Sequence, residues 1–167
     1  MAINITPKTV STLQSLVHDA FDVNATLDRI KTVMDTDLVY PKFSYYVHEL
    51  AHNYALDMAD GIGDLLEIYS EPVNYGNIGE HTETYDSIQN AVNEIYEIVL
   101  IFQNELNEGS KIAFDNMDIH IFKGLLDIIE KHNEYVRQVI IWKDITDKYG
   151  DKPSLDVHIK DYDVLNR

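Results

Sequence analysis

The feature that most limits how this chain can fold is a helical spacing of apolar residues that recurs in four long stretches. Apolar side chains return every three or four residues over 7–35, 43–70, 83–108 and 114–149, which places them on one face of an α-helix. No stretch alternates apolar and polar residues in the way that a half-buried strand does. The sequence therefore predicts an all-α fold, an antiparallel bundle of four helices.

Helix-breaking residues fall between these stretches and set their limits. Thr6 followed by Pro7 is typical of a helix start, because threonine caps free N–H groups and proline suits the first turn. The longest connection is expected at 71–82, where a proline and two glycines cluster. We expect one domain, a bundle over residues 1–149, followed by a polar tail at 150–167 that is either loose or docked.

The charge and the composition exclude several classes of function. The chain has 29 acidic and 13 basic residues and a net charge of −16. This charge argues against nucleic acid as a partner, because such binding needs basic groups at the phosphates, and against a polybasic membrane anchor. Cysteine is absent, which excludes disulfides, zinc–thiolate sites and iron–sulfur clusters. We see no signal peptide and no apolar run long enough for a bilayer. We therefore expect a cytoplasmic protein without membrane contact.

The second helical stretch carries the densest set of metal-binding side chains. With about 100° of rotation per residue, its apolar side chains form one stripe and its histidines and carboxylates lie on the other face. Such nitrogen and oxygen donors suit iron, and also zinc or manganese. The candidate metal ligands are His48, His52, Asp60, Asp64 and Glu67. The alternative is an ordinary solvated face with polar histidines.

Two other metal sites can be tested against the same residues. His48, Glu49 and His52 form an HExxH pattern, in which two histidines bind zinc and the glutamate acts as general base of a hydrolase. The chain offers no third ligand in that motif and no sheet beside the helix. A di-iron centre inside the bundle needs two ExxH motifs, and the fourth stretch offers only Glu130 with Asn133. Both readings are therefore weaker than a site on the outer face.

Three segments have counterparts in one known family. They are residues 31–48, ending in Val47-His48-Glu49 where the family has Leu-His-Glu, residues 67–72, and residues 129–132, which read Ile-Glu-Lys-His against Ile-Asp-Lys-His. On these segments the chain resembles the Dps-type mini-ferritins (DNA protection during starvation proteins). The resemblance implies a ferritin-like antiparallel four-helix bundle that assembles as a homo-oligomer, a shell of twelve subunits.

The resemblance also implies an activity and a site. Members oxidise Fe(II) with peroxide or oxygen at a ferroxidase centre between two subunits and store ferric iron in the shell, which protects against oxidative damage. In this chain His48 falls on the family's second histidine, His52 on the nearby acid, and Glu67 on the glutamate of the other subunit. The family's lysine-rich N-terminal arm is absent.

Two positions depart from the family pattern. Thr36 stands where the first histidine is expected and Gly63 where the aspartate is expected. Asp60 and Asp64 keep the spacing of an acidic pair in a shifted register and could compensate. Gly61 and Gly63 also lie mid-helix, where glycine is costly, and they favour a close approach of another helix at a subunit contact, with local flexibility as the alternative. The alternative function is a non-catalytic ferritin-like structural protein with a degenerate metal site.

Overall fold

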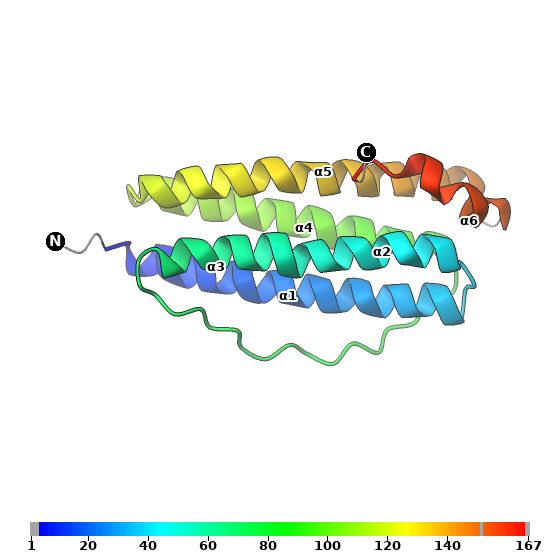
Figure 1. The fold of residues 1–167 in the computed structure, drawn as a ribbon, viewed down its shortest axis with the longest axis horizontal. Helices are drawn as coiled ribbons and strands as arrows, with labels where there is room; N and C mark the ends of the chain where they lie inside the picture. The colour runs from blue at the N-terminus through cyan, green and yellow to red at the C-terminus, as the bar shows by residue number, and fades with distance from the viewer. Residues whose placement is uncertain (1–3, 151, 166–167) are drawn as a thin grey trace.

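The computed structural model describes residues 4–150 and 152–165, and its main feature is a bundle of four long helical rods (Figure 1). The second rod is continuous but changes its hydrogen bonding in the middle. No strand occurs among the described residues, and the prediction of an all-α four-helix bundle is confirmed. The elements are α1 (Pro7–Thr36), α2 (Pro41–Asn53), η1 (Tyr54–Ala59), α3 (Asp60–Glu67), α4 (Ile88–Asp115), α5 (Ile119–Tyr149), α6 (Ser154–His158) and η2 (Ile159–Tyr162).

A long irregular connection, residues 68–87, joins α3 to α4 and is called the strap below. Figure 1 shows it running along the whole bundle, so that α4 starts at the end where α2 starts. The strap is longer than the connection predicted at 71–82, because α4 begins at Ile88 and not near residue 83. Ser87 fixes that start, since its hydroxyl accepts a hydrogen bond from the N–H of Asn90 at 3.2 Å.

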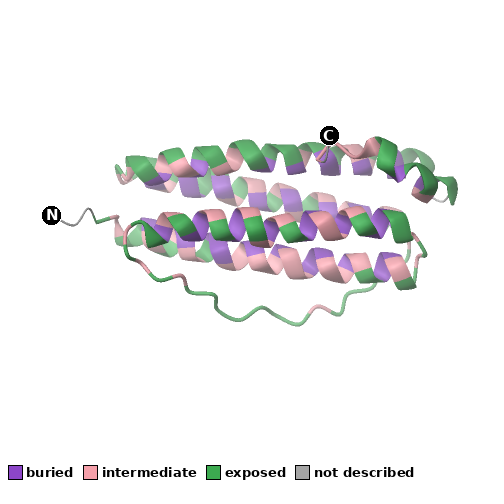
Figure 2. Cartoon of the chain, viewed as in Figure 1, coloured by how far each residue is buried: buried purple, intermediate pink, exposed green. Residues whose placement is uncertain are grey.

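The core lies where the four apolar faces meet, as the inward-facing buried residues in Figure 2 show. Its largest fully buried side chains are aromatic, among them Trp142, Tyr54, Tyr135, Phe43 and Phe102. The helix start predicted at Thr6 and Pro7 is found, but the Thr6 side chain forms no capping hydrogen bond. The N–H of Thr6 instead donates to the carboxylate of Asp118, at 3.3 Å. None of the described helices is long and apolar enough to cross a membrane.

The described part of the tail folds back on the bundle. The carboxylate of Asp156 in α6 accepts hydrogen bonds from the N–H groups of Lys42 at 3.1 Å and Phe43 at 2.8 Å. It therefore supplies the missing cap of α2. Further along, the buried side chain of Gln138 donates to the carbonyl of Tyr162 at 2.9 Å. These contacts fix α6 and η2 against α2 and α5.

Candidate functional site

The second rod contains a π-helical segment, η1, directly after the two candidate histidines. A π-helix adds one residue to a turn, so every later side chain lags by about 100° behind its place in an uninterrupted α-helix. The position of Leu66 shows this lag. In an uninterrupted α-helix Leu66, about five turns after His48, would point to the same side as His48, but it is fully buried. Glu67 takes the outward position instead.

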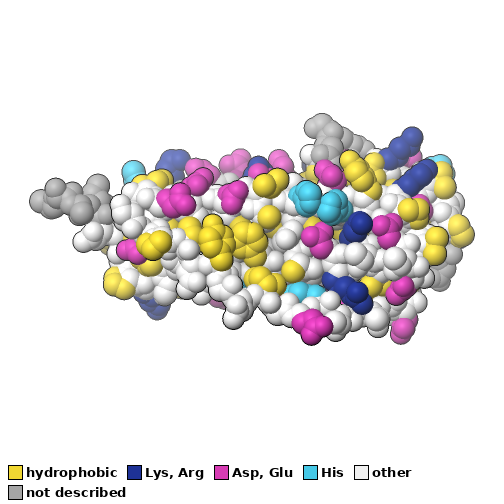
Figure 3. Space-filling model, turned by 60° about the horizontal axis from the view of Figure 1, so that its bottom comes forward, with side chains coloured by type: hydrophobic (Ala, Val, Ile, Leu, Met, Phe, Trp, Pro, Cys, Tyr) yellow, Lys and Arg dark blue, Asp and Glu magenta, His cyan; other side chains and the backbone are white. Residues whose placement is uncertain are grey.

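Because of this lag, all five predicted ligands lie on one outer stripe. A regular α-helix of the same sequence would place the carboxylates further round the helix, away from the histidines. His52, Asp60, Asp64 and Glu67 are exposed and His48 is half-buried. The face in Figure 3 has two adjacent histidines near its middle and acidic side chains further towards its left end. We call the residues His48, His52, Asp60, Asp64 and Glu67 the ligand stripe.

The histidine end of the stripe is held by α1. The Nδ1 atom of His48 lies 3.1 Å from a carboxylate oxygen of Asp28, and because a carboxylate can only accept, Nδ1 carries the hydrogen. The other nitrogen, Nε2, is then the lone-pair donor that a metal ion needs. Such a carboxylate–histidine pair is the usual support of a metal-binding imidazole. The ring of His52 packs on that of His48 with centroids 4.2 Å apart.

The stripe does not close on a metal ion within one chain. His52 and Asp60 are separated by about 12 Å along the helix at 1.5 Å per residue, and Glu67 lies further still. Among the described residues no three His, Asp or Glu side chains converge closely enough to hold a metal. The same finding leaves the HExxH pair without a third ligand in that part of the chain.

A different histidine, His132 of α5, is buried in the bundle interior. Its Nε2 atom lies 2.6 Å from the hydroxyl of Tyr54, and its Nδ1 atom lies 2.6 Å from the amide oxygen of Gln103. Because the amide oxygen accepts, Nδ1 carries the hydrogen and Nε2 accepts from the tyrosine. The rings of Phe102 and Tyr135 surround this chain of hydrogen bonds. Both nitrogens of His132 are thereby used.

Burial fixes the charge state of this interior network. It lowers the pKa of His132 to about 3 and raises the pKa of Tyr54 well above its usual value. Both groups are therefore neutral near pH 7. Next to them, the hydroxyl of Tyr135 donates to Asp57 at 3.0 Å, and Lys131 pairs with the same carboxylate at 3.1 Å. The interior of the bundle is occupied by a satisfied polar network.

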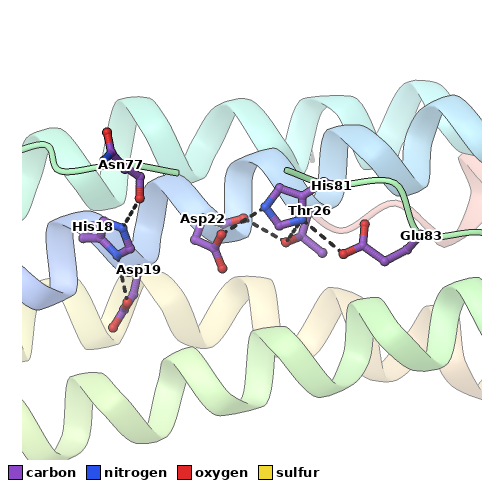
Figure 4. A network of polar contacts seen from close by, with 7 residues as sticks. All are labelled: His18, Asp19, Asp22, Thr26, Asn77, His81 and Glu83. Atoms are coloured by element: carbon purple, nitrogen blue, oxygen red, sulfur yellow. Dashed lines mark hydrogen bonds and ion pairs between the residues drawn. The ribbon is translucent and has the colours of Figure 1, made fainter. Parts of the chain in front are cut away.

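One ridge of α1 binds the strap through side chains spaced one turn apart. His18 contacts the carbonyl of Asn77 through Nε2 at 2.8 Å, and Asp22 contacts His81 at 3.0 Å (Figure 4). The contacting residues of α1 are Gln14, His18, Asp22, Thr26 and Arg29. His81 also lies 3.3 Å from Glu83, so each of its nitrogens faces a carboxylate.

The same ridge carries an acidic pair where α1 meets α4. The pKa of Glu105 is raised to about 7, chiefly by burial and further by the negative charge of Asp19, with which it shares a hydrogen bond. Asp19 also lies 3.4 Å from Nδ1 of His18. The pKa of His18 is raised, first by its hydrogen bond to Asn77 and then by the one to Asp19. A chain of proton-binding groups thus links α4 to the strap.

Two positions that differ from the mini-ferritin pattern have structural roles here. The hydroxyl of Thr36 donates to the carbonyl of Thr32 at 2.8 Å at the end of α1. Gly63 is buried, and a Cβ on it would come within 3.3 Å of Val73 in the strap. The close neighbour predicted for Gly63 is therefore this chain's own strap and not a helix of a second subunit.

The interior network and the strap contacts were not predicted from the sequence. His132 could have been found, because it stands seven residues after Leu125 and seven before Val139 on the apolar stripe of α5. His81 gave no comparable signal, since it lies in an irregular segment without periodicity.

Comparison with known proteins gives a clear result for the fold. No protein-family model and no curated protein sequence matches the chain. Among solved structures, an open pore ferritin from the hyperthermophilic archaeon Archaeoglobus fulgidus superposes with a TM-score of 0.87 at 14% identity, over 95% of this chain and 96% of that chain. A second structure under that description gives 0.88 at 16% identity, over 95% and 98%.

A closed form of the Archaeoglobus fulgidus ferritin, engineered by site-directed mutagenesis, gives a TM-score of 0.87 at 14% identity, over 95% of this chain and 96% of that chain. Identities this low concern the fold and not the residues of a site. The strap also supports a ferritin-like fold, because a long crossover between the second and third helices distinguishes ferritin-like bundles from simple up-and-down bundles. The chain folds as a ferritin-like four-helix bundle.

Proposed function

We propose that this chain is an iron-binding and iron-storing ferritin-like protein whose metal site is completed when two copies pack through α2, η1 and α3. The single observation that supports the site is the symmetry of the ligand stripe about Leu56. His52 and Asp60 each stand four residues from Leu56, and His48 and Asp64 each stand eight residues from it. An isologous contact between two antiparallel copies, centred on Leu56, brings unlike donors together.

That contact pairs each histidine with a carboxylate of the second copy. A two-fold axis at Leu56 sets His52 opposite Asp60 of the second copy, and His48 opposite Asp64. The axis then carries two equivalent groups of donors, one on each side. Leu56 itself is 65% exposed, and this contact buries it at the centre, in keeping with the apolar core and polar rim of protein interfaces. The donors that lie too far apart in one chain are adjacent in the pair.

The chemistry of the site follows from its donors. Nε2 of His48 and the ring of His52 bind Fe(II) as nitrogen ligands, and the carboxylates of the second copy neutralise its charge. Asp28 orients His48 and keeps the hydrogen on Nδ1. Iron is the substrate: each Fe(II) loses one electron to oxygen or peroxide, and ferric iron is stored in a shell, which we expect to be dodecameric. Removal of Fe(II) and peroxide together protects against oxidative damage.

The sharpest test mixes two variants that lack opposite halves of the site. His48→Ala with His52→Ala removes the nitrogen donors, and Asp60→Asn with Asp64→Asn removes the carboxylates. Each variant alone should lose Fe(II) binding by calorimetry. A mixed pair contains one intact site, so unfolding and refolding the two variants together should restore about a quarter of the wild-type sites, as random pairing requires.

The control for this mixing is Asp144→Asn, an exposed carboxylate of α5 on another face, which should leave Fe(II) binding unchanged. Mixed particles that form and still bind no Fe(II) would contradict a site shared between copies. Sedimentation with elemental analysis of the wild-type protein comes first. A small assembly with one bound zinc per chain would point to the HExxH pair instead.

A non-catalytic structural protein is the second candidate, and one observation favours it. Thr36 and Gly63, at two ligand positions of the mini-ferritin pattern, are both committed to contacts within the chain. Consumption of oxygen or peroxide on addition of Fe(II) separates the two candidates. A large assembly that binds Fe(II) without consuming either oxidant would be a store without a ferroxidase, and one that ignores Fe(II) would be a structural shell.

A further inference from the structure

A groove separate from the ligand stripe lies between the start of α2 and the turn η2. Its volume is about 300 Å³, at the small end of the range of about 300–1,000 Å³ for small-molecule sites. Its walls are mainly apolar and aromatic, formed by Tyr45 and Tyr46 on one side and by Val157 and Ile159 on the other. Tyr45 is 56% exposed and Val157 is 53% exposed. Apolar surface therefore remains uncovered in the groove.

Two lysines frame the groove, one on each wall. Lys42 belongs to α2 and Lys160 to η2, and both are exposed. Within the described residues neither ammonium group takes part in an ion pair or hydrogen bond. In a chain with a net charge of −16, the residues that line this groove include two lysines and no acidic side chain. A carboxylate attracted there can rest its apolar part on the tyrosines.

The acidic groups nearby limit the charge of the ligand. Asp156, at the same junction, already caps the N-terminus of α2, so that helix end is not free for an anion. Burial raises the pKa of Tyr46, and the negative charges of Asp163 and Asp161 raise it further, so this wall stays neutral near pH 7. With two lysines in the lining and three aspartates nearby, a ligand with one negative charge is balanced better than a ligand with several.

We propose that this groove binds a small organic monocarboxylate with an apolar body, such as a medium-chain alkyl or aryl carboxylate. Lys42 and Lys160 bind the carboxylate, and Tyr45, Val157 and Ile159 cover the apolar part. Because one wall belongs to α2 and the other to the tail, the ligand joins the two and holds η2 in place. Tyr45 stands one turn before His48 on α2, so the groove borders the contact between two copies proposed above, but none of its lining residues is a proposed metal ligand.

The test compares three probes of equal length on the full chain. Octanoate should bind saturably, as followed by calorimetry and by changes in the tyrosine resonances, whereas octanol and octylammonium should bind at least about tenfold more weakly. Lys42→Glu and Lys160→Glu should each weaken octanoate about tenfold, the loss of one charge-assisted contact. Lys8→Glu, an exposed lysine at the start of α1, is the control and should bind octanoate as the wild type does.

Three results would overturn the proposal. Equal binding of octanol and octanoate would show that the lysines do not select charge. Unchanged affinity in both groove variants, with circular dichroism showing them folded, would place the carboxylate elsewhere. Absence of octanoate binding together with self-association that Tyr45→Ser weakens, measured by sedimentation, would mean that a second copy of the chain covers the groove.

Discussion

The interior His132 and the outer His48 are both histidines with a polar partner at hydrogen-bond distance, yet they suit opposite purposes. His132 uses both nitrogens, one towards Tyr54 and one towards Gln103. Among the described residues, His48 forms a hydrogen bond through Nδ1 alone, to Asp28, and its side chain is 38% exposed. A histidine with both nitrogens satisfied stabilises the fold, whereas one with a directed and open Nε2 can take a ligand. The number of free nitrogens separates the structural region from the proposed binding region.

The largest expected effect is on stability and tests the structural member of the pair. His132→Ala leaves a cavity and removes the partners of Tyr54 and Gln103, so the free energy of unfolding should fall by about 3–5 kcal/mol. Urea denaturation at neutral pH measures it. The matched variant His52→Ala, on the exposed stripe, should change stability by no more than about 0.5 kcal/mol. Equal losses in the two variants would erase the distinction between the regions.

The acid dependence of stability sharpens the same comparison. The pKa of His132 falls from its model-peptide value of 6.5 to about 3 on folding, so the folded state stays neutral where the unfolded state gains a proton. Its contribution is therefore present above about pH 6.5, and the free energy of unfolding should fall by about 1.4 kcal/mol per pH unit below that. Denaturation between about pH 6.5 and 5 should give the wild type a slope that exceeds the slope of His132→Gln by this amount, while the raised pKa of Glu105 adds the same opposite slope to both proteins. A shared slope would assign the acid sensitivity to other groups.

A smaller effect is expected at the outer histidine. Asp28→Ala removes the carboxylate that orients His48, so affinity for Fe(II) should fall about 10–100-fold while the fold stays intact. Calorimetry on the assembled protein measures the affinity, with Asp144→Ala as an exposed control. If Asp28→Ala binds as the wild type does while His48→Ala does not, the carboxylate has no supporting role.

The smallest effect concerns the strap. His18 is neither buried like His132 nor free at one nitrogen like His48, because one of its acceptors is the carbonyl of Asn77 in the strap. The pKa of His18 is raised, so the protonated form stabilises the contact. That stabilisation is complete below the ordinary value and is lost as the pH rises through the raised one. The amide of Asn74, bound by Gln14 at 2.7 Å, should exchange faster at about pH 8 than at about pH 6 after correction for intrinsic rates. His18→Gln should remove that difference, and a difference that persists would assign it to His81.

Most of the bundle could be predicted because helix formation is encoded by the spacing of neighbouring residues in the sequence. Periodic apolar residues placed the four helices, with the start of α1 correct at Thr6 and Pro7 and the start of α4 predicted five residues too early, since that helix begins at Ile88. Tyr85 stands three residues before Ile88 and so fits the helical spacing, but it belongs to the strap and is half-buried against the core. A pattern of apolar spacing cannot tell a docked loop from a first helical turn.

For the candidate site, the sequence could suggest which residues to consider but not how they are arranged. His48, His52 and the three carboxylates were identifiable from residue type and spacing. Their alignment depends on η1, and no sequence pattern that we recognise predicts this π-helical segment. The π-helical lag is a property of backbone hydrogen bonding, and the partner of His48, Asp28, comes from another helix. Neither follows from spacing along one segment.

The strap has a consequence for how the chain reaches its fold. It divides the molecule into two hairpins, α1 with α2–α3 and α4 with α5, each closed by a short turn. Contacts within a hairpin are close in sequence and form quickly, whereas contacts between the hairpins close a loop across the whole strap. Folding is then expected to proceed as two local units followed by their docking. A strap released from α1 would let one hairpin dock with that of a neighbouring chain, exchanging halves between subunits.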